Sequence, residues 1–347
     1  MTGGAKKLGP FKMALAGAGM ISAFHLKGWQ KLGNRVELVA LCDPDPERGQ
    51  ARAKEFGIAK VYQDRDRMLE AEAIDVLDIA SPRETHAAWV EAAARRGIDV
   101  LCQKPMTPTL AESEALVRRV GDRIRLMVHE NWRFRPWYRV LKAWIEEGAL
   151  GRILHADMAM INSGFLPDAE GLRFSLNRQP FMQHEKRLMI AEVLIHHLDV
   201  MRYLLGELRV GAARATRTVP DIVGETMASI FLETAEGASA VVTGTMAAAG
   251  YQPRVPDRLE ILGSTASVLF ENDELRLLGP KPRSQRYDRD QGYQASFDGV
   301  IRHFIECLET GQPFETDPAD NLQTLRLVEH AYWAAGLHET GKRPARA

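Results

Sequence analysis

The chain has 347 residues, of which 45% are hydrophobic and 26% charged, and its formal net charge is −1. This length predicts two packed domains, and the composition is typical of a folded globular protein rather than a disordered one. Because a nearly neutral chain offers no extended basic surface, we expect no nucleic-acid partner.

The three cysteines are far apart in the sequence and form neither a C-x-x-C pair nor an even framework: Cys42, Cys102 and Cys307. This pattern indicates free thiols in a reducing compartment. The first long apolar run, residues 13–24, is interrupted by glycines and lacks a signal-peptide cleavage site. No run reaches the roughly 18 apolar residues of a membrane span. We therefore expect a cytoplasmic protein without a membrane partner.

Short apolar runs alternate with helix-forming segments over residues 8–128. We predict strands over residues 11–16, 36–42, 74–79, 99–102 and 124–128. We predict helices from the glycine turn at residue 17 to residue 32 and over 45–56, 85–96 and 110–120. Parallel neighbouring strands need a crossover between them, so this alternation predicts an α/β domain with a doubly wound parallel sheet, a Rossmann domain.

The pattern changes over residues 129–340. After a predicted helix at 138–147, strand-like runs follow at 153–161, 210–217, 226–233, 239–246 and 258–262, and few helices separate the later ones. Residues 280–289 are the most loop-like stretch. We predict a second, α+β domain with a large, mostly antiparallel sheet.

A glycine turn lies between the first predicted strand and the helix that follows it. Residues 16–22 fit the pattern G-x-G-x-x-small, with Ser22 at the small position. Glycines at such a junction permit a tight turn and let the backbone approach a pyrophosphate at the helix N-terminus. We expect a dinucleotide there, in contact with Gly17, Gly19, Met20 and Ile21.

The next predicted strand ends in an acidic residue, Asp43, 24 residues after Gly19. A carboxylate near this spacing accepts hydrogen bonds from the adenosine ribose and repels a 2′-phosphate. Because Pro44 rather than an arginine follows, the pattern favours NAD over NADP as the cofactor. The alternative is that the glycines only turn the chain and that Asp43 caps the next helix.

Further matches run through most of the chain in a fixed order. They are Ser81 and Pro82 followed by His86, residues 100–105 with Gln103 and Lys104, residues 131–134 beginning with Asn131, and residues 195–199 ahead of 203–206. Together these segments resemble the glucose–fructose oxidoreductase/inositol dehydrogenase (Gfo/Idh/MocA) family.

The resemblance implies the roles of several residues. In that family the lysine of a Glu-Lys-Pro sequence lies beside the nicotinamide, and an Asp-x-x-x-His pair completes the reacting centre, which implies that Lys104, Glu192 and His196 are catalytic. It also implies further contacts with the cofactor from Ser81, Pro82, His86, Gln103, Lys104 and Asn131. Gln103 and Glu192 depart from the family's Glu and Asp.

Residues 190–206 predict a helix with one polar side. At about 100° per residue, the side chains of Glu192, His196, Asp199 and Tyr203 fall within roughly 60° of each other, opposite an apolar face. This stripe is a candidate wall of an active site, and a solvated helix face is the alternative. His197 falls nearer the apolar side, and we interpret it as structural.

Oxidation of an alcohol needs a hydride acceptor and a base for the hydroxyl proton. We assign the base to His196, the polarising cation to Lys104 and the orienting carboxylate to Glu192, with Asp199 as the alternative partner. Arg133 is a further substrate-binding candidate. It lies in a cluster of arginines and tryptophans that an ion-pair network between domains explains equally well. The scattered histidines indicate no metal site.

The resemblance implies NAD-dependent oxidation of a monosaccharide or polyol hydroxyl, with a pentose such as D-apiose, oxidised to its lactone, as the most specific expectation. It also implies a homodimer or homotetramer that uses one face of the second domain's sheet. Two other functions remain open: a dinucleotide-sensing regulator without turnover, and a lyase or glycosidase in which NAD is reduced and then reoxidised.

Overall fold

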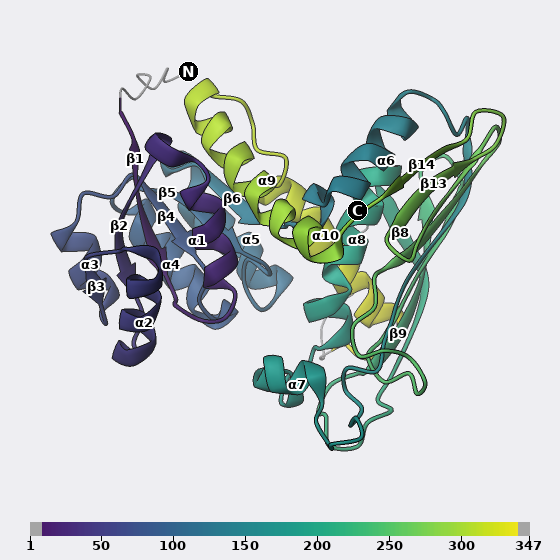
Figure 1. Cartoon of the computed structure of the whole chain (residues 1–347), viewed down its shortest axis with the longest axis horizontal. Helices are drawn as coiled ribbons and strands as arrows, with labels where there is room; N and C mark the ends of the chain where they lie inside the picture. The colour runs from purple at the N-terminus through teal and green to yellow at the C-terminus, as the bar shows by residue number, and fades with distance from the viewer. Residues whose placement is uncertain (1–8, 339–347) are drawn as a thin grey trace. The chain divides into compact units, whose positions relative to one another are not determined.

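The structure, a computed structural model, describes residues 9–338. These residues form two compact units (Figure 1). Unit 1 contains the described residues up to Phe134 together with Tyr293–Leu322, and unit 2 contains the remainder. The predicted domain ends at residue 8 and at residues 339–340 lie outside the described residues.

Unit 1 is built on a six-stranded parallel sheet with the order β3-β2-β1-β4-β5-β6. Its strands are β1 (Phe11–Ala16), β2 (Val36–Cys42), β3 (Val61–Tyr62), β4 (Val76–Ile79), β5 (Asp99–Gln103) and β6 (Leu126–His129). The helices between them are α1 (Ser22–Gln30), α2 (Pro46–Phe56), α3 (Arg65–Ala71), α4 (His86–Ala94) and α5 (Leu110–Val120). The predicted doubly wound α/β fold is confirmed.

Local sequence signals set the ends of these helices. Asp45 caps α2 by accepting hydrogen bonds from the second and third residues of the helix, and Gly57 ends it in the left-handed conformation. Thr109 and Glu112 form a reciprocal capping box at the start of α5. The crossovers are therefore encoded close to where they occur in the sequence.

A helix from the C-terminal part of the chain completes the core of unit 1. Five side chains of α9 (Arg289–Thr310) belong to the same apolar cluster as the strand and helix residues Leu15 and Leu26: Val300, Ile301, Phe304, Ile305 and Cys307. Gly28 of α1 permits this packing, because a Cβ there would lie 2.7 Å from the side chain of Ile301. Unit 1 thus depends on a segment far from the rest of it in sequence.

Unit 2 contains an eight-stranded sheet with the order β14-β13-β12-β11-β7-β10-β9-β8. The strands are β7 (Ile153–Ile161), β8 (Leu208–Thr216), β9 (Met227–Thr234), β10 (Ser239–Thr245), β11 (Arg258–Gly263), β12 (Ser267–Glu271), β13 (Glu274–Leu278) and β14 (Arg283–Arg286). Only β10 and β7 pair in parallel, so the predicted, mostly antiparallel sheet is confirmed.

The remaining α-helices of the described residues are α6 (Pro136–Glu146), α7 (Phe174–Arg178), α8 (Ile195–Leu205) and α10 (Pro318–Ala334). The prediction of a loop over residues 280–289 is wrong at β14, where all four side chains are exposed and polar. An edge strand of this kind carries no alternation of apolar residues. No helix within residues 9–338 is long and apolar enough to cross a membrane.

Candidate active site

The strand pairing of unit 1 brings four loops together at the carboxyl ends of its parallel strands. Ala16 lies opposite both Cys42 and Ile79, and Ile79 lies opposite Cys102, so β1, β2, β4 and β5 end together. The loops that leave there carry most of the predicted cofactor residues: Gly17, Gly19, Met20, Ile21, Asp43, Ser81, Pro82, Gln103 and Lys104. The strand order reverses between β1 and β4, which is the position at which doubly wound sheets bind ligands.

The glycine turn has the geometry of an anion-binding loop. Gly17 has a φ of +97°, and a Cβ there would lie 2.8 Å from the backbone of both Ala80 and Ser81. At Gly19, by contrast, no atom among the described residues lies within 4 Å of the position that a Cβ would take. Among the described residues no side chain caps the first turn of α1; Ser22 N and Phe24 N donate to the backbone oxygens of Gly19 and Ile21 at 3.2 and 3.0 Å.

Asp43 is buried at the end of β2, and it is not the cap of the next helix. Its carboxylate accepts hydrogen bonds from Ala18 N at 2.7 Å, from Asp45 N at 2.9 Å and from the Arg48 guanidinium at 2.7 Å. Burial alone would raise the pKa of Asp43, but these hydrogen bonds and the charge of Arg48 hold it below its usual value. The carboxylate is therefore ionised near neutrality and connects β2 to the glycine turn.

The lysine loop after β5 is held by a chain of buried hydrogen bonds. Gln103 Oε1 accepts from Lys104 N at 2.7 Å, and Gln103 Nε2 lies 3.0 Å from His25 Nε2. His25 Nδ1 lies 2.8 Å from Asp78 Oδ2, which also accepts from Trp29 Nε1. When the Gln103 amide donates to His25, the ring of His25 is neutral, with its proton on Nδ1 toward Asp78. With glutamine in place of glutamate, Asp78 is the one carboxyl group among these four side chains.

Two further predicted cofactor residues, His86 and Asn131, form hydrogen bonds with loop backbone and with a helix side chain. The ring nitrogens of His86 contact Ser81 O at 2.9 Å and Pro105 O at 3.0 Å, so His86 connects the loops after β4 and β5. Asn131 is buried and donates from Nδ2 to Ser296 Oγ on α9 at 2.7 Å. Sequence reasoning did not predict this loop-to-loop role of His86.

In unit 2, the helix that carries His196 does not start as predicted. Met189–Val193 form a π-helical turn, and α8 begins only at Ile195. A π turn contains more residues than an α turn, so spacing of 100° per residue does not place Glu192 relative to His196. The prediction of one regular helix from residue 190 is wrong. Glu192 is half-buried on the π turn and His196 is buried on α8.

A buried carboxylate stabilises the π turn. Glu225 accepts hydrogen bonds from Ile190 N at 3.0 Å and from Leu188 N at 3.3 Å, and the Tyr332 hydroxyl donates to it as well. The same hydroxyl accepts from Ala191 N at 3.3 Å. These groups satisfy N–H donors that a helix start leaves open. Sequence reasoning missed Glu225 and Tyr332, because no local pattern connects them to residues 189–193.

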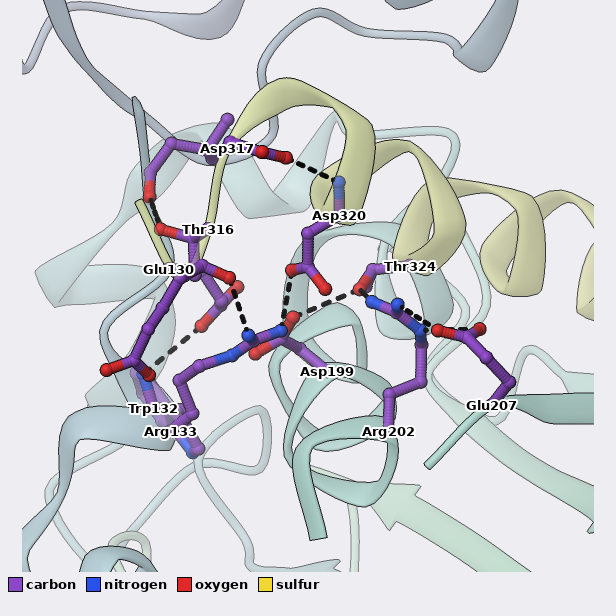
Figure 2. Close-up of polar contacts among 12 residues, drawn as sticks. Glu130, Trp132, Arg133, Asp199, Arg202, Glu207, Thr316, Asp317, Asp320 and Thr324 are labelled. Atoms are coloured by element: carbon purple, nitrogen blue, oxygen red, sulfur yellow. Dashed lines mark hydrogen bonds and ion pairs between the residues drawn. The ribbon is translucent and has the colours of Figure 1, made fainter. Parts of the chain in front are cut away.

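The other polar residues of the predicted stripe have partners on neighbouring elements. Asp199 is fully buried and accepts from Thr324 Oγ1 on α10 at 3.0 Å (Figure 2). The Tyr203 hydroxyl accepts from Arg139 on α6 at 3.1 Å. His197 is buried against Asp257 at 3.0 Å, as expected for a structural histidine.

Arg133 lies in an ion pair inside unit 1. Its side chain is 4% exposed, and it donates to Asp320 Oδ2 at 2.8 Å and to Glu315 O at 3.0 Å (Figure 2). Arg135 pairs with Asp257 inside unit 2 at 2.8 Å. These ion pairs account for the burial of both guanidinium groups.

Unit 1 is a Rossmann unit that combines this glycine turn, an ionised acid after β2 and a lysine loop beside them. These features define the class: an oxidoreductase that binds a nicotinamide dinucleotide. Residues 11–129 match the model of an oxidoreductase family with an NAD-binding Rossmann fold, and residues 138–269 match the GFO/IDH/MocA C-terminal domain. The chain belongs to the GFO/IDH/MocA family, and it is an NAD-dependent dehydrogenase that acts on CH–OH groups.

Relatives are similar along nearly the whole chain. The chain is 33% identical to a D-apiose dehydrogenase of Paraburkholderia graminis over 94% of its length and 88% of the relative. It is 31% identical to a D-apiose dehydrogenase of Rhizobium rhizogenes over 95% of its length and 96% of the relative. An Agrobacterium radiobacter oxidoreductase solved with NAD+, L-tartaric acid and magnesium covers 94% of this chain, and this chain covers 96% of it, at 30% identity and a TM-score of 0.86.

Proposed function

We propose that the enzyme oxidises a hydroxyl group of a monosaccharide or polyol, with D-apiose, oxidised to its lactone, as the specific substrate. The observation that carries this proposal is the lysine loop after β5, which lies at the same sheet edge as the glycine turn and is fixed through Gln103 and His25. The whole-length similarity to two D-apiose dehydrogenases supports the choice of sugar.

The chemistry assigns one task to each polar side chain. Bound NAD supplies the hydride acceptor, and the chain must remove the hydroxyl proton and stabilise the developing charge on oxygen. The Lys104 ammonium donates to the reacting oxygen and stabilises its alkoxide character. His196 accepts the hydroxyl proton, and Glu192 orients the imidazole or binds a neighbouring hydroxyl.

The remaining predicted site residues are assigned either to the cofactor or to the substrate. Ser81, Pro82, His86 and Asn131 complete the cofactor site, and Arg133 and Asp199 are the further substrate-binding candidates. Lys104 belongs to unit 1 and His196 to unit 2.

Replacing Lys104 with Ala tests this mechanism. We expect kcat to fall by about 10²–10³, as it does when one donor to a developing oxyanion is removed, while NADH binding is nearly unchanged. Lys60→Ala is the matched control, because Lys60 is exposed and pairs with Glu72. Unchanged turnover of Lys104→Ala on a substrate that the wild type oxidises would refute the assignment.

A screen of NAD reduction across aldoses, polyols and sugar acids identifies the substrate. A dehydrogenase accumulates one NADH for each product molecule formed. Product without net NADH would instead indicate the lyase or glycosidase, and NADH binding without turnover of any substrate would indicate the regulator.

We also propose that the enzyme is a cytoplasmic homodimer or homotetramer. All three cysteines are free and buried, which suits a reducing compartment. On β9 the exposed side of the sheet carries Met227 and Phe231, of which 37% and 40% are exposed. Light scattering should give a mass of two or four chains, and Phe231→Glu should reduce it. An unchanged mass would exclude this face.

A further inference from the structure

The hydrogen bonds that connect α1, β4 and β5 inside unit 1 run in one direction, which the lysine loop fixes at one end. Lys104 N donates to Gln103 Oε1 at 2.7 Å. A backbone N–H can only donate, so this contact identifies the oxygen of the amide and leaves its nitrogen facing His25 Nε2 at 3.0 Å. The Gln103 amide therefore donates to His25, whose Nε2 is an acceptor.

The other end of the chain requires the same direction. His25 Nδ1 lies 2.8 Å from Asp78 Oδ2, and Trp29 Nε1 donates to the same oxygen at 2.6 Å. Because an indole N–H can only donate, Oδ2 is an acceptor there. His25 thus carries its proton on Nδ1 and donates it to Asp78. A single tautomer of this imidazole satisfies the neighbours on both of its sides.

The surroundings of His25 hold its ring in place. Both His25 and Asp78 are fully buried. The imidazole packs against His129 with ring centroids 4.2 Å apart, and it meets Phe297 of α9 edge-on at 5.3 Å. A ring packed in this way cannot turn to another partner unless the core opens. The Gln103 amide is therefore oriented by a group that is itself fixed.

Lys104 depends on this amide because its own side chain is long and flexible. A lysine ammonium lies at the end of a four-carbon stem, so the backbone decides first where it can reach. The group that Gln103 holds is the N–H of Lys104 itself. An error of about 1 Å in the position of a catalytic group can lower turnover about a hundredfold.

We propose that His25 is a positioning residue for Lys104. It accepts from the Gln103 amide and so fixes the backbone of the lysine loop, while Asp78 keeps the imidazole in the tautomer that this requires. Because His25 is fully buried, it acts through Gln103 rather than on a ligand. The inference rests on the proposed role of Lys104 in the oxidation of a hydroxyl group.

Two substitutions of His25 separate this role from a purely structural one. The amide of Gln reaches the place of Nε2, so His25→Gln can still accept from Gln103 but loses the contact with Asp78. The shorter Asn reaches the place of Nδ1, so His25→Asn can still donate to Asp78 but leaves Gln103 without this acceptor. We expect His25→Gln to retain most of kcat and His25→Asn to lower it about tenfold to a hundredfold. A residue needed only to satisfy Asp78 would give the reverse order.

Turnover is measured per NADH-binding site, so that misfolded molecules do not count. The substrate is one that the wild type oxidises and Lys104→Ala does not. The Kd of NADH should stay constant in both His25 variants. Asp99→Asn is the control, because it removes a carboxylate from the opposite end of β5, where Asp99 accepts from Arg125 N at 2.8 Å. It should leave kcat unchanged.

Nitrogen NMR of protein labelled at the histidine rings adds a measurement that needs no substrate. The signals of His25 are those missing from His25→Gln, and we expect them to show a proton on Nδ1 and none on Nε2. A proton on Nε2 in the wild type would overturn the proposal, and so would a kcat of His25→Asn equal to that of the wild type. An equal loss of kcat in both variants would overturn it as well. Failure of the proposed function would appear elsewhere, as full turnover by Lys104→Ala.

Discussion

Removing Asp257 should cost more stability than removing any exposed charge of unit 2. This carboxylate is buried just before β11 and accepts from Arg135 at 2.8 Å, from Tyr138 at 3.0 Å and from His197 at 3.0 Å. Burial alone would raise the pKa of Asp257, but the charges of His197 and Arg135 hold it well below its usual value. The group thus joins α6, α8 and β11 through one buried negative charge.

The magnitude follows from what Asp257→Ala leaves behind. Three hydrogen bonds to an ionised group contribute about 1.5–3 kcal/mol each before relaxation. Relaxation of the surroundings reduces this sum, but the guanidinium of Arg135 keeps its charge. The side chain of Arg135 is only 11% exposed, and an orphaned buried charge of this kind costs about 3–5 kcal/mol. We expect the free energy of unfolding to fall by that amount.

Urea denaturation measures this loss, with tryptophan fluorescence as the signal, to which Trp137 contributes. Trp137 is buried and stacks on Phe270 with ring centroids 5.1 Å apart, so its emission reports on the packing around α6. Glu147→Ala is the control, because it breaks an exposed ion pair with Arg283, a kind of pair worth about 1 kcal/mol or less. A loss for Asp257→Ala no larger than the control's would refute the reasoning.

Three further predictions concern pH, the glycine turn and the π turn. Because the folded-state pKa of Asp257 lies below the unfolded value of about 3.9, its stabilisation is complete above that pH and is lost as the pH falls through the folded pKa. Acid titrations of Asp257→Asn should therefore show a flatter loss of stability below about pH 4 than the wild type. Gly17→Ala should weaken NADH binding by at least about tenfold, measured by fluorescence titration, because its Cβ would meet Ala80 and Ser81 at 2.8 Å and its φ is +97°. Glu225→Gln should lower kcat while the Kd of NADH stays constant, and equal changes in both would contradict a role in placing the π turn.

The fold of unit 1 could be predicted from the sequence because its signals are local. The strands β1, β2, β4, β5 and β6 are apolar runs next to their helices, and the caps of α2 and α5 lie within four residues of the helix starts. The association of α9 with this unit could not be predicted. Its apolar side chains pack against β1 and α1, which are more than half the chain length away in sequence. No local pattern indicates this packing, because it depends on the tertiary structure.

The candidate site divides in the same way. Gly17, Gly19 and Asp43 could be proposed as cofactor residues because the turn and the acid have a characteristic spacing along the chain. Arg48 was missed because only the next residue, Pro44, was considered, whereas the guanidinium reaches Asp43 from the first turn of α2.

The π turn was missed for a different reason. Its geometry depends on Glu225, which is more than thirty residues away in sequence and accepts two backbone N–H groups that a regular helix start would present elsewhere. Helical periodicity assumes that the backbone is regular. The buried Glu225 carboxylate, from the loop before β9, overrides that assumption, and with it the expected alignment of Glu192 with His196.

The departure at Gln103 shows how such distant partners change the meaning of a local sequence. Read alone, glutamine for glutamate removes a charge next to Lys104. In the structure the amide both accepts from Lys104 N and donates to His25, whose opposite nitrogen faces Asp78. A carboxylate at residue 103 has no N–H to donate, so it could not make the hydrogen bond that the amide makes to His25 Nε2. The lysine loop is therefore held by the side chains of Gln103, His25 and Asp78 together, and the first of them must be able to both accept and donate.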